Sequence, residues 1–296
     1  MIRIATLSLA VAVSGGVAAG AWVTPPAQAQ EVQAARSIIL ADEAPDLHRL
    51  LDTMGMYEII ALIGTEGLRG AADVEDQLFP EAGGAAWRAT VMGLHGTDRM
   101  VGLFEEAFNR DGVTPAQIAE VQAFLDTDIG RRLIAGEVAA RRAFLDDDAV
   151  AAATDIFMTA VQGEDPRLDL LRRVNEVNGL IDRNVSGALN LRFSFYRGLI
   201  DGGAFDNDVP EDLMLAEVWG HEPEVRQATV ERLFSFQLLA YSGASDADLE
   251  AYIEIAASPA GRAVNAALFS AFDEMLAQLS YDLGYAAAGF IAGEDT

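Results

Sequence analysis

The stretch that decides the fold is GASDADLEAYIEIAASPAGRAVNA, residues 243–266. Ser245 is a good helix N-cap, and the acidic residues that follow it suit the positive end of a helix dipole. Leu249, Ile253 and Ala256 then recur at the spacing of one helical face. These signals predict an amphipathic helix that begins just after Ser245.

A second helix is predicted directly after the first. Ser258-Pro259 ends one helix and opens the next, because proline fits the first position of a helix. Val264, Leu268 and Met275 continue as the apolar face of this longer helix.

The same pattern occurs earlier in the chain, as GVTPAQIAEVQAFLDTDIGRRLIA over residues 112–135. It aligns with residues 243–266 without a gap, and the cap, glycine, arginine and apolar positions are identical or conservatively replaced. The repeat indicates an internal duplication. We therefore expect an all-α protein made of two related helical-bundle halves.

The halves are expected at residues 46–165 and 166–296. The seam is the polar stretch QGEDP, residues 162–166, where glycine and proline interrupt the helical pattern. Residues 167–200 predict a long amphipathic helix broken near Gly179. Trp87 and Trp219 are expected in similar places of the two halves.

Residues 1–29 are predicted to be a signal peptide. Arg3 precedes an apolar run that ends at Pro25-Pro26, and Ala27-Gln28-Ala29 fits a cleavage site. The alternative is a retained membrane anchor, because the run approaches the shortest length that spans a bilayer. Cleavage would give an exported, periplasmic chain with a flexible lead-in over residues 30–45 and no membrane insertion.

The charge of the chain excludes several partners. The chain contains 20 basic and 46 acidic residues, which give a net charge of −26. Such a charge repels nucleic acid and anionic lipid surfaces. Solubility explains it most simply, and a cationic partner or divalent-cation buffering are the alternatives. All the basic residues are arginine and cysteine is absent, which excludes Schiff-base lysines, disulfides and thiolate metal sites.

No metal or cofactor is expected. The histidines are His48, His95 and His221, and they lack the close spacing of a zinc site. The chain also lacks a nucleophile-elbow sequence and a glycine-rich phosphate loop.

Gly130-Arg131 and Gly261-Arg262 are the candidate binding residues. An arginine near a helix N-terminus, present twice, would suit an anionic ligand. In the alternative interpretation the glycine lets two helices approach closely, and the arginine pairs with a neighbouring carboxylate. Both interpretations stay open from the sequence.

The segment from Ser245 to Arg262 resembles a known family, the domain of unknown function 2059, found in exported bacterial proteins. The shared pattern is an acidic helix start, an aromatic residue such as Tyr252, and Ser-Pro-x-Gly-Arg/Lys opening a second helix. The first copy departs from it, with Asp128 in place of the proline. The resemblance implies an all-helical fold, and it supplies no activity and no catalytic residues.

The expected function is a non-catalytic binding or interaction module of the cell envelope, with another envelope protein as its partner. One alternative is a carboxylate-dependent hydrolase that uses Glu222, Glu224 and Asp98 beside the histidines. The other is an envelope assembly subunit with an exposed apolar patch. A concave surface between the halves would favour the first function, and a buried carboxylate of raised pKa lining a cleft would favour the hydrolase.

Overall fold

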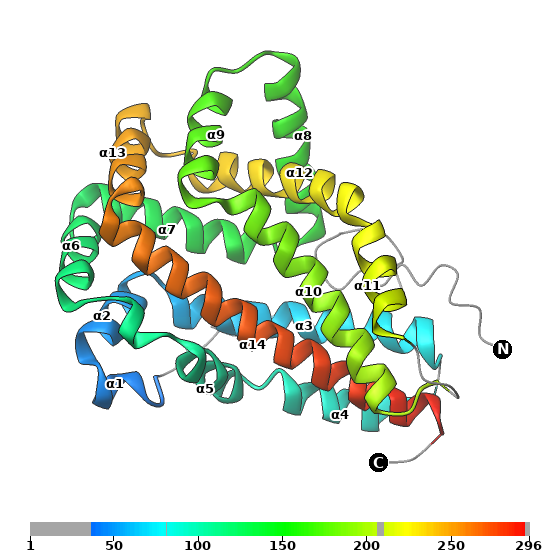
Figure 1. Cartoon of the computed structure of the whole chain (residues 1–296). Helices are drawn as coiled ribbons and strands as arrows, with labels where there is room; N and C mark the ends of the chain where they lie inside the picture. The colour runs from blue at the N-terminus through cyan, green and yellow to red at the C-terminus, as the bar shows by residue number, and fades with distance from the viewer. Residues whose placement is uncertain (1–36, 81, 206–209, 294–296) are drawn as a thin grey trace.

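The computed structural model describes residues 37–80, 82–205 and 210–293, so the expected signal peptide lies outside the described residues. Every regular element within these ranges is a helix, and the chain is all-α as predicted (Figure 1). The helices are α1 Leu40–Glu43, α2 Pro45–Thr53, α3 Met56–Leu78, α4 Gly84–Leu94, α5 Thr97–Ala107, the 3₁₀ helix η1 Arg110–Gly112, α6 Pro115–Leu125, α7 Asp128–Ala143, α8 Asp147–Gln162, α9 Arg167–Asn178, α10 Leu180–Asp201, α11 Glu211–Gly220, α12 Glu222–Ala240, α13 Asp246–Ala257 and α14 Pro259–Ile291.

The repeated pattern folds into two helix–turn–helix units, α6–α7 and α13–α14. Thr114 and Ser245 cap the first helix of each unit, as predicted for Ser245. Gln117 and Asp248 complete both caps by accepting a hydrogen bond from the N–H of the cap residue, at 2.8 and 3.0 Å. These capping boxes satisfy amides that a helix start otherwise leaves without partners.

The helices of the two halves follow one another in the same order. Helices α2 to α7 can be matched in their order along the chain with helices α9 to α14, and α8 stands between the two series. A left-handed glycine joins the first two helices of each series, Gly55 with φ 69° and Gly179 with φ 62°. Gly179 thus breaks the amphipathic stretch of residues 167–200, as predicted.

Helices at matching places in the two series also pack in matching pairs. Helix α2 contacts α3 and α6, and α9 contacts α10 and α13. The two series are joined by crossed contacts, because α5 packs against α14 and α12 packs against α7. The halves expected at residues 46–165 and 166–296 therefore share their packing surfaces instead of each closing on itself.

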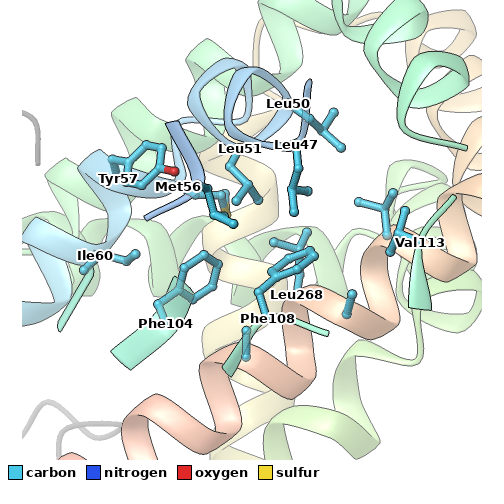
Figure 2. Close-up of a cluster of buried hydrophobic side chains, with 14 of the residues drawn as sticks. Leu47, Leu50, Leu51, Met56, Tyr57, Ile60, Phe104, Phe108, Val113 and Leu268 are labelled. Carbon is cyan, nitrogen blue, oxygen red and sulfur yellow. The ribbon is translucent and has the colours of Figure 1, made fainter. Parts of the chain in front are cut away.

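One hydrophobic core lies between α14 and the helices of the first series. Leu268 of α14 meets Leu47 of α2 and Phe108 there (Figure 2). The rings of Phe104 and Phe272 lie 4.8 Å apart. The predicted apolar face of α14 is confirmed, since Val264, Leu268 and Met275 are all buried.

Close backbone approach joins α10 to α14, which run side by side through the molecule (Figure 1). A Cβ atom on Gly198 would lie 2.1 Å from the carbonyl oxygen of Tyr281, and one on Gly284 would lie 2.1 Å from that of Phe195. Only glycine permits these contacts, so both positions fix the separation of the two helices.

The lead-in expected over residues 30–45 is packed against the core from Ser37 onward. The carboxylate of Glu105, on α5, accepts hydrogen bonds from Ser37 Oγ at 2.6 Å and from the Ile39 N–H at 2.7 Å. It thereby holds the start of α1, and Leu40 is completely buried. The prediction of a flexible segment is wrong for residues 37–45. Glu105 holds these residues, and because it lies more than sixty residues away in sequence, no local pattern indicated this contact.

Trp87 and Trp219 occupy different environments. Trp87 on α4 is buried against Phe79 and Phe290, and its Nε1 donates to the Ala71 carbonyl at 2.8 Å. Trp219 on α11 is 49% exposed. The two tryptophans thus lie on helices that hold the same place in the two series, but they differ in burial, and α14 packs against α4.

Candidate binding surface

The two predicted glycines occupy matching places, each in the first turn of its helix. Thr127 and Ser258 cap these helices and accept hydrogen bonds from the N–H groups of Gly130 and Gly261, at 3.1 and 3.0 Å. A Cβ atom on Gly130 would lie 2.4 Å from the Phe124 carbonyl oxygen. The close approach of the glycine to the preceding helix is therefore confirmed.

The two arginines also make matching contacts. Arg131 donates to the carbonyl of Asp126 and Arg262 to the carbonyl of Ala257, each five residues back at the end of the preceding helix. Arg131 also pairs with Asp128 at 2.7 Å. Pro259 stands at the position that corresponds to Asp128, and Arg262 has no carboxylate within ion-pair distance in the described structure. Both arginines thus help to close a helix–helix turn.

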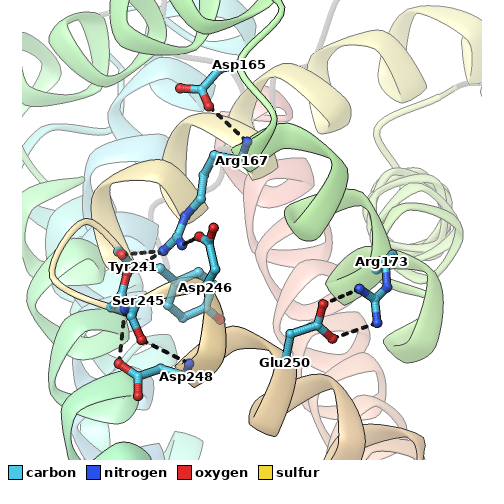
Figure 3. A network of polar contacts seen from close by, with 9 residues as sticks. Asp165, Arg167, Arg173, Tyr241, Ser245, Asp246, Asp248 and Glu250 are labelled. Atoms are coloured by element: carbon cyan, nitrogen blue, oxygen red, sulfur yellow. Dashed lines mark hydrogen bonds and ion pairs between the residues drawn. The ribbon is translucent and has the colours of Figure 1, made fainter.

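The turn between α12 and α13, which leads into the second helix–turn–helix unit, is tied to its neighbours by polar contacts (Figure 3). Arg167, at the start of α9, donates to the carbonyls of Tyr241 and Ala244 at 3.0 and 2.8 Å and also pairs with Asp246. The cap hydrogen bond with Ser245, and after it the guanidinium of Arg132, lower the pKa of Asp248.

A shallow depression lies beside this network, between α9 and α13. Arg173 and Glu250 form a two-fold hydrogen-bonded ion pair on its wall, which Figure 3 also shows. Because each charge satisfies the other, the pair leaves little for a charged ligand to bind.

The carboxylates named for the hydrolase lie at the surface. Glu224 is 82% exposed and sits 3.2 Å from His221, while Glu222 pairs with Arg226. Asp98 is exposed as well. Burial lowers the pKa of His95. These residues therefore do not gather into a water-excluding acid–base site.

A carboxylate of raised pKa lies elsewhere, at the contact of α7 with α12. Burial raises the pKa of Glu137, and the hydrogen bond from Tyr241 Oη, at 2.5 Å, opposes that shift. Glu137 follows Leu133 and precedes Ala140 in the apolar stripe of α7, and that spacing was a signal for its burial. It lines neither of the two depressions described here.

Two further properties concern only the described residues. They contain no group of three histidine, aspartate or glutamate side chains placed to hold a metal ion. None of their helices is both long enough and apolar enough to cross a membrane.

A second depression, of about 650 Å³, lies at the seam between the halves. Its walls come from α8, from the turn that follows α8, and from α12. The lining residues are Asp155, Ile156, Thr159, Ala160, Gly163, Asp165, Pro166 and Leu238. It is a concave surface at the junction of the two halves, and we call it the α8–α12 depression.

Helix α8 is held to the rest of the protein along one narrow face. Ala153 and Ala160 are buried, and the Phe157 ring stacks on Phe234 of α12 at 5.6 Å. Ile156 is 54% exposed and lines the depression, while Met158 is 45% exposed and lies outside it. The sequence analysis assigned no role to α8. Its apolar residues are more numerous than a single buried stripe of a helix requires, and this was a signal that some of them are exposed.

Comparison with family models, with curated proteins and with solved structures gives no match to this chain. The resemblance to the domain of unknown function 2059 therefore stays a prediction.

Proposed function

We propose that this protein is a non-catalytic interaction module that binds a partner protein in the α8–α12 depression. The observation that carries the proposal is the exposure of Ile156 in a concave surface whose other lining residues, apart from Asp155 and Asp165, are small or apolar. An exposed apolar side chain in a depression is stabilised when a partner covers it. The partner is expected to be another envelope protein.

The remaining candidate sites support other roles less well. The Gly-Arg pairs use their arginines within the helix turns, and the hydrolase candidates Glu222, Glu224 and Asp98 are spread over the surface. An envelope assembly subunit is a special case of the proposed interaction module, since it would use the same exposed apolar surface.

We also propose that the chain arose by an internal duplication and that it is exported to the periplasm. The shared helix order, the left-handed glycines and the paired contacts support an internal duplication, in which α8 is an element outside the repeat. The sequence of residues 1–29 supports export to the periplasm. A fusion of residues 1–35 to a reporter should be exported and cleaved after Ala29, and an uncleaved membrane-bound product would contradict this.

Site-specific photo-crosslinking in the full chain tests the binding surface. A crosslinking residue at Ile156 should yield an adduct with a discrete partner protein in the periplasm. Met158 is the matched control, because it lies on the same helix with similar exposure but outside the depression. Identical adducts from both positions, or none from Ile156, would contradict the proposed function.

A further inference from the structure

The rim of the α8–α12 depression carries only negative charge. Residues 143–166 contain six acidic residues and no basic one. Asp155 and Asp165 line the depression, and Glu164 lies in the turn between its walls. In the part of the chain that the structure describes, none of these three carboxylates has an arginine within ion-pair distance.

The nearest arginines in sequence are engaged elsewhere. Arg167 donates its guanidinium N–H groups to the α12–α13 turn, and only its backbone N–H reaches Asp165, at 2.9 Å. Arg142, on the other side of the acidic stretch, pairs with Glu58. The rim is thus left without compensating charge in a protein that pairs many of its arginines with carboxylates.

An apolar floor with an anionic rim fits an occupant of complementary chemistry. A large apolar side chain would cover Ile156 and Leu238, and lysine or arginine side chains one turn away would reach the rim carboxylates. A second copy of this chain is a poor occupant, because each copy carries a net charge of −26.

We infer that the α8–α12 depression binds a basic amphipathic segment of a partner protein. This inference rests on the proposed function and adds the charge and shape of the partner. Recognition combines burial of the exposed Ile156 with ion pairs between Asp155 and Glu164 and basic side chains of the partner. The acidic residues of the 143–166 segment thereby gain a role in binding.

Binding of synthetic peptides to the full-length mature chain tests the inference. The probe is a fluorescent 18-residue helix of leucine and lysine, and the matched peptides replace lysine by glutamine or glutamate. We expect the lysine peptide to bind and the glutamate peptide not to bind. Fluorescence anisotropy should also show that binding weakens as salt concentration rises.

Two variants locate the binding. Asp155→Asn with Glu164→Gln should weaken the lysine peptide about fivefold, as expected for the loss of two exposed charge pairs. Ile156→Ser should weaken it as well. The matched control is Asp73→Asn with Asp76→Asn, which removes two exposed charges from α3 and should change the affinity less than twofold. Circular dichroism verifies that each variant is folded.

The outcomes separate this inference from the proposed function. Equal loss of affinity in the rim and control variants would show attraction to net charge alone and would overturn the inference. A glutamine peptide that binds as tightly as the lysine peptide, and depends on Ile156, would overturn the charge requirement while supporting the proposed function. No binding of any peptide would overturn the inference, and the crosslink at Ile156 would then decide the proposed function.

Discussion

Gly261 lies against the carbonyl oxygen of Ile255, so closely that a Cβ atom on the glycine would be 2.1 Å from it. The contact sets the angle at which α14 leaves α13, and α14 in turn supplies one side of the core shared by the two halves. A side chain at this position must therefore displace a helix that several others pack against.

We predict that Gly261→Leu lowers the free energy of unfolding by about 1–3 kcal/mol through overpacking. Arg262→Ala should cost less, about 0–1 kcal/mol, because the arginine is exposed and closes the turn through one carbonyl contact. Thermal melts of the two variants give the comparison. A Gly261→Leu protein that melts like the wild type, beside an Arg262→Ala protein that loses a partner, would identify the pair as a binding site.

Glu105 should make the start of the described fold sensitive to acid. Burial alone would raise its pKa, but the hydrogen bonds from Ser37, Ile39, Tyr57 and Ile38 together outweigh burial and lower it. The carboxylate therefore stabilises the fold above its unfolded pKa of about 4.3, and the contribution is lost as the pH falls through the folded pKa.

Glu105→Gln should lower the free energy of unfolding at pH 7 by about 1–3 kcal/mol, because hydrogen bonds to a charged group are lost. Urea unfolding measures the difference between wild type and variant at pH 7 and again below pH 4. We expect the difference to shrink at the lower pH. A difference that is the same at both values would contradict a stabilising role for the ionised carboxylate.

Glu137 should show the opposite pH dependence. Its pKa is raised in the folded chain, chiefly by burial, so the folded state favours the protonated acid. Its contribution to stability is complete below the unfolded pKa of about 4.3 and is lost as the pH rises through the folded pKa. Glu137→Gln should remove this loss while still accepting the hydrogen bond from Tyr241. At pH 7 the variant should be at least as stable as the wild type, and a clear destabilisation in urea titrations would contradict the prediction.

Local features of the fold were predictable because their signals are local. Ser245, Ser258-Pro259 and Gly179 set helix ends through caps and backbone preferences that involve only a few neighbouring residues. The apolar face of α14 followed from its helical spacing. These elements were confirmed at the residues that the sequence indicated.

Long-range features could not be predicted in the same way. The crossed contacts of α5 with α14 and of α12 with α7 join segments far apart in sequence, and no periodicity encodes which faces meet. In the sequence, Glu105 cannot be distinguished from an exposed acidic residue, because its hydrogen-bond partners Ser37 and Ile39 lie far away along the chain. The candidate surface was missed for a related reason, since the exposure of Ile156 depends on how little of α8 is covered by α12.

The turn after α8 should gain stability when Glu164 is replaced by glycine. Glu164 is the non-glycine residue with a positive φ in the described structure, 49°, and the next amide, Asp165, donates to the Ala160 carbonyl at 3.0 Å. Glycine is the preferred residue in this conformation at a helix end, and other residues pay roughly 1 kcal/mol for it. Glu164→Gly should therefore raise the free energy of unfolding by up to about 0.5 kcal/mol, after the greater conformational entropy of glycine in the unfolded chain is subtracted.

The same substitution removes a carboxylate from the rim of the α8–α12 depression. Glu164→Gly is thus predicted to stabilise the protein while weakening the lysine peptide, a combination expected where a strained residue is retained for binding. Glu164→Gln separates the two effects, because it keeps the strain and should weaken the peptide without a gain in stability. Thermal melts and anisotropy on both variants give the four values needed. A Glu164→Gly protein that is less stable than the wild type would show that the glutamate side chain stabilises the turn, and the assignment of strain at this position would then be wrong.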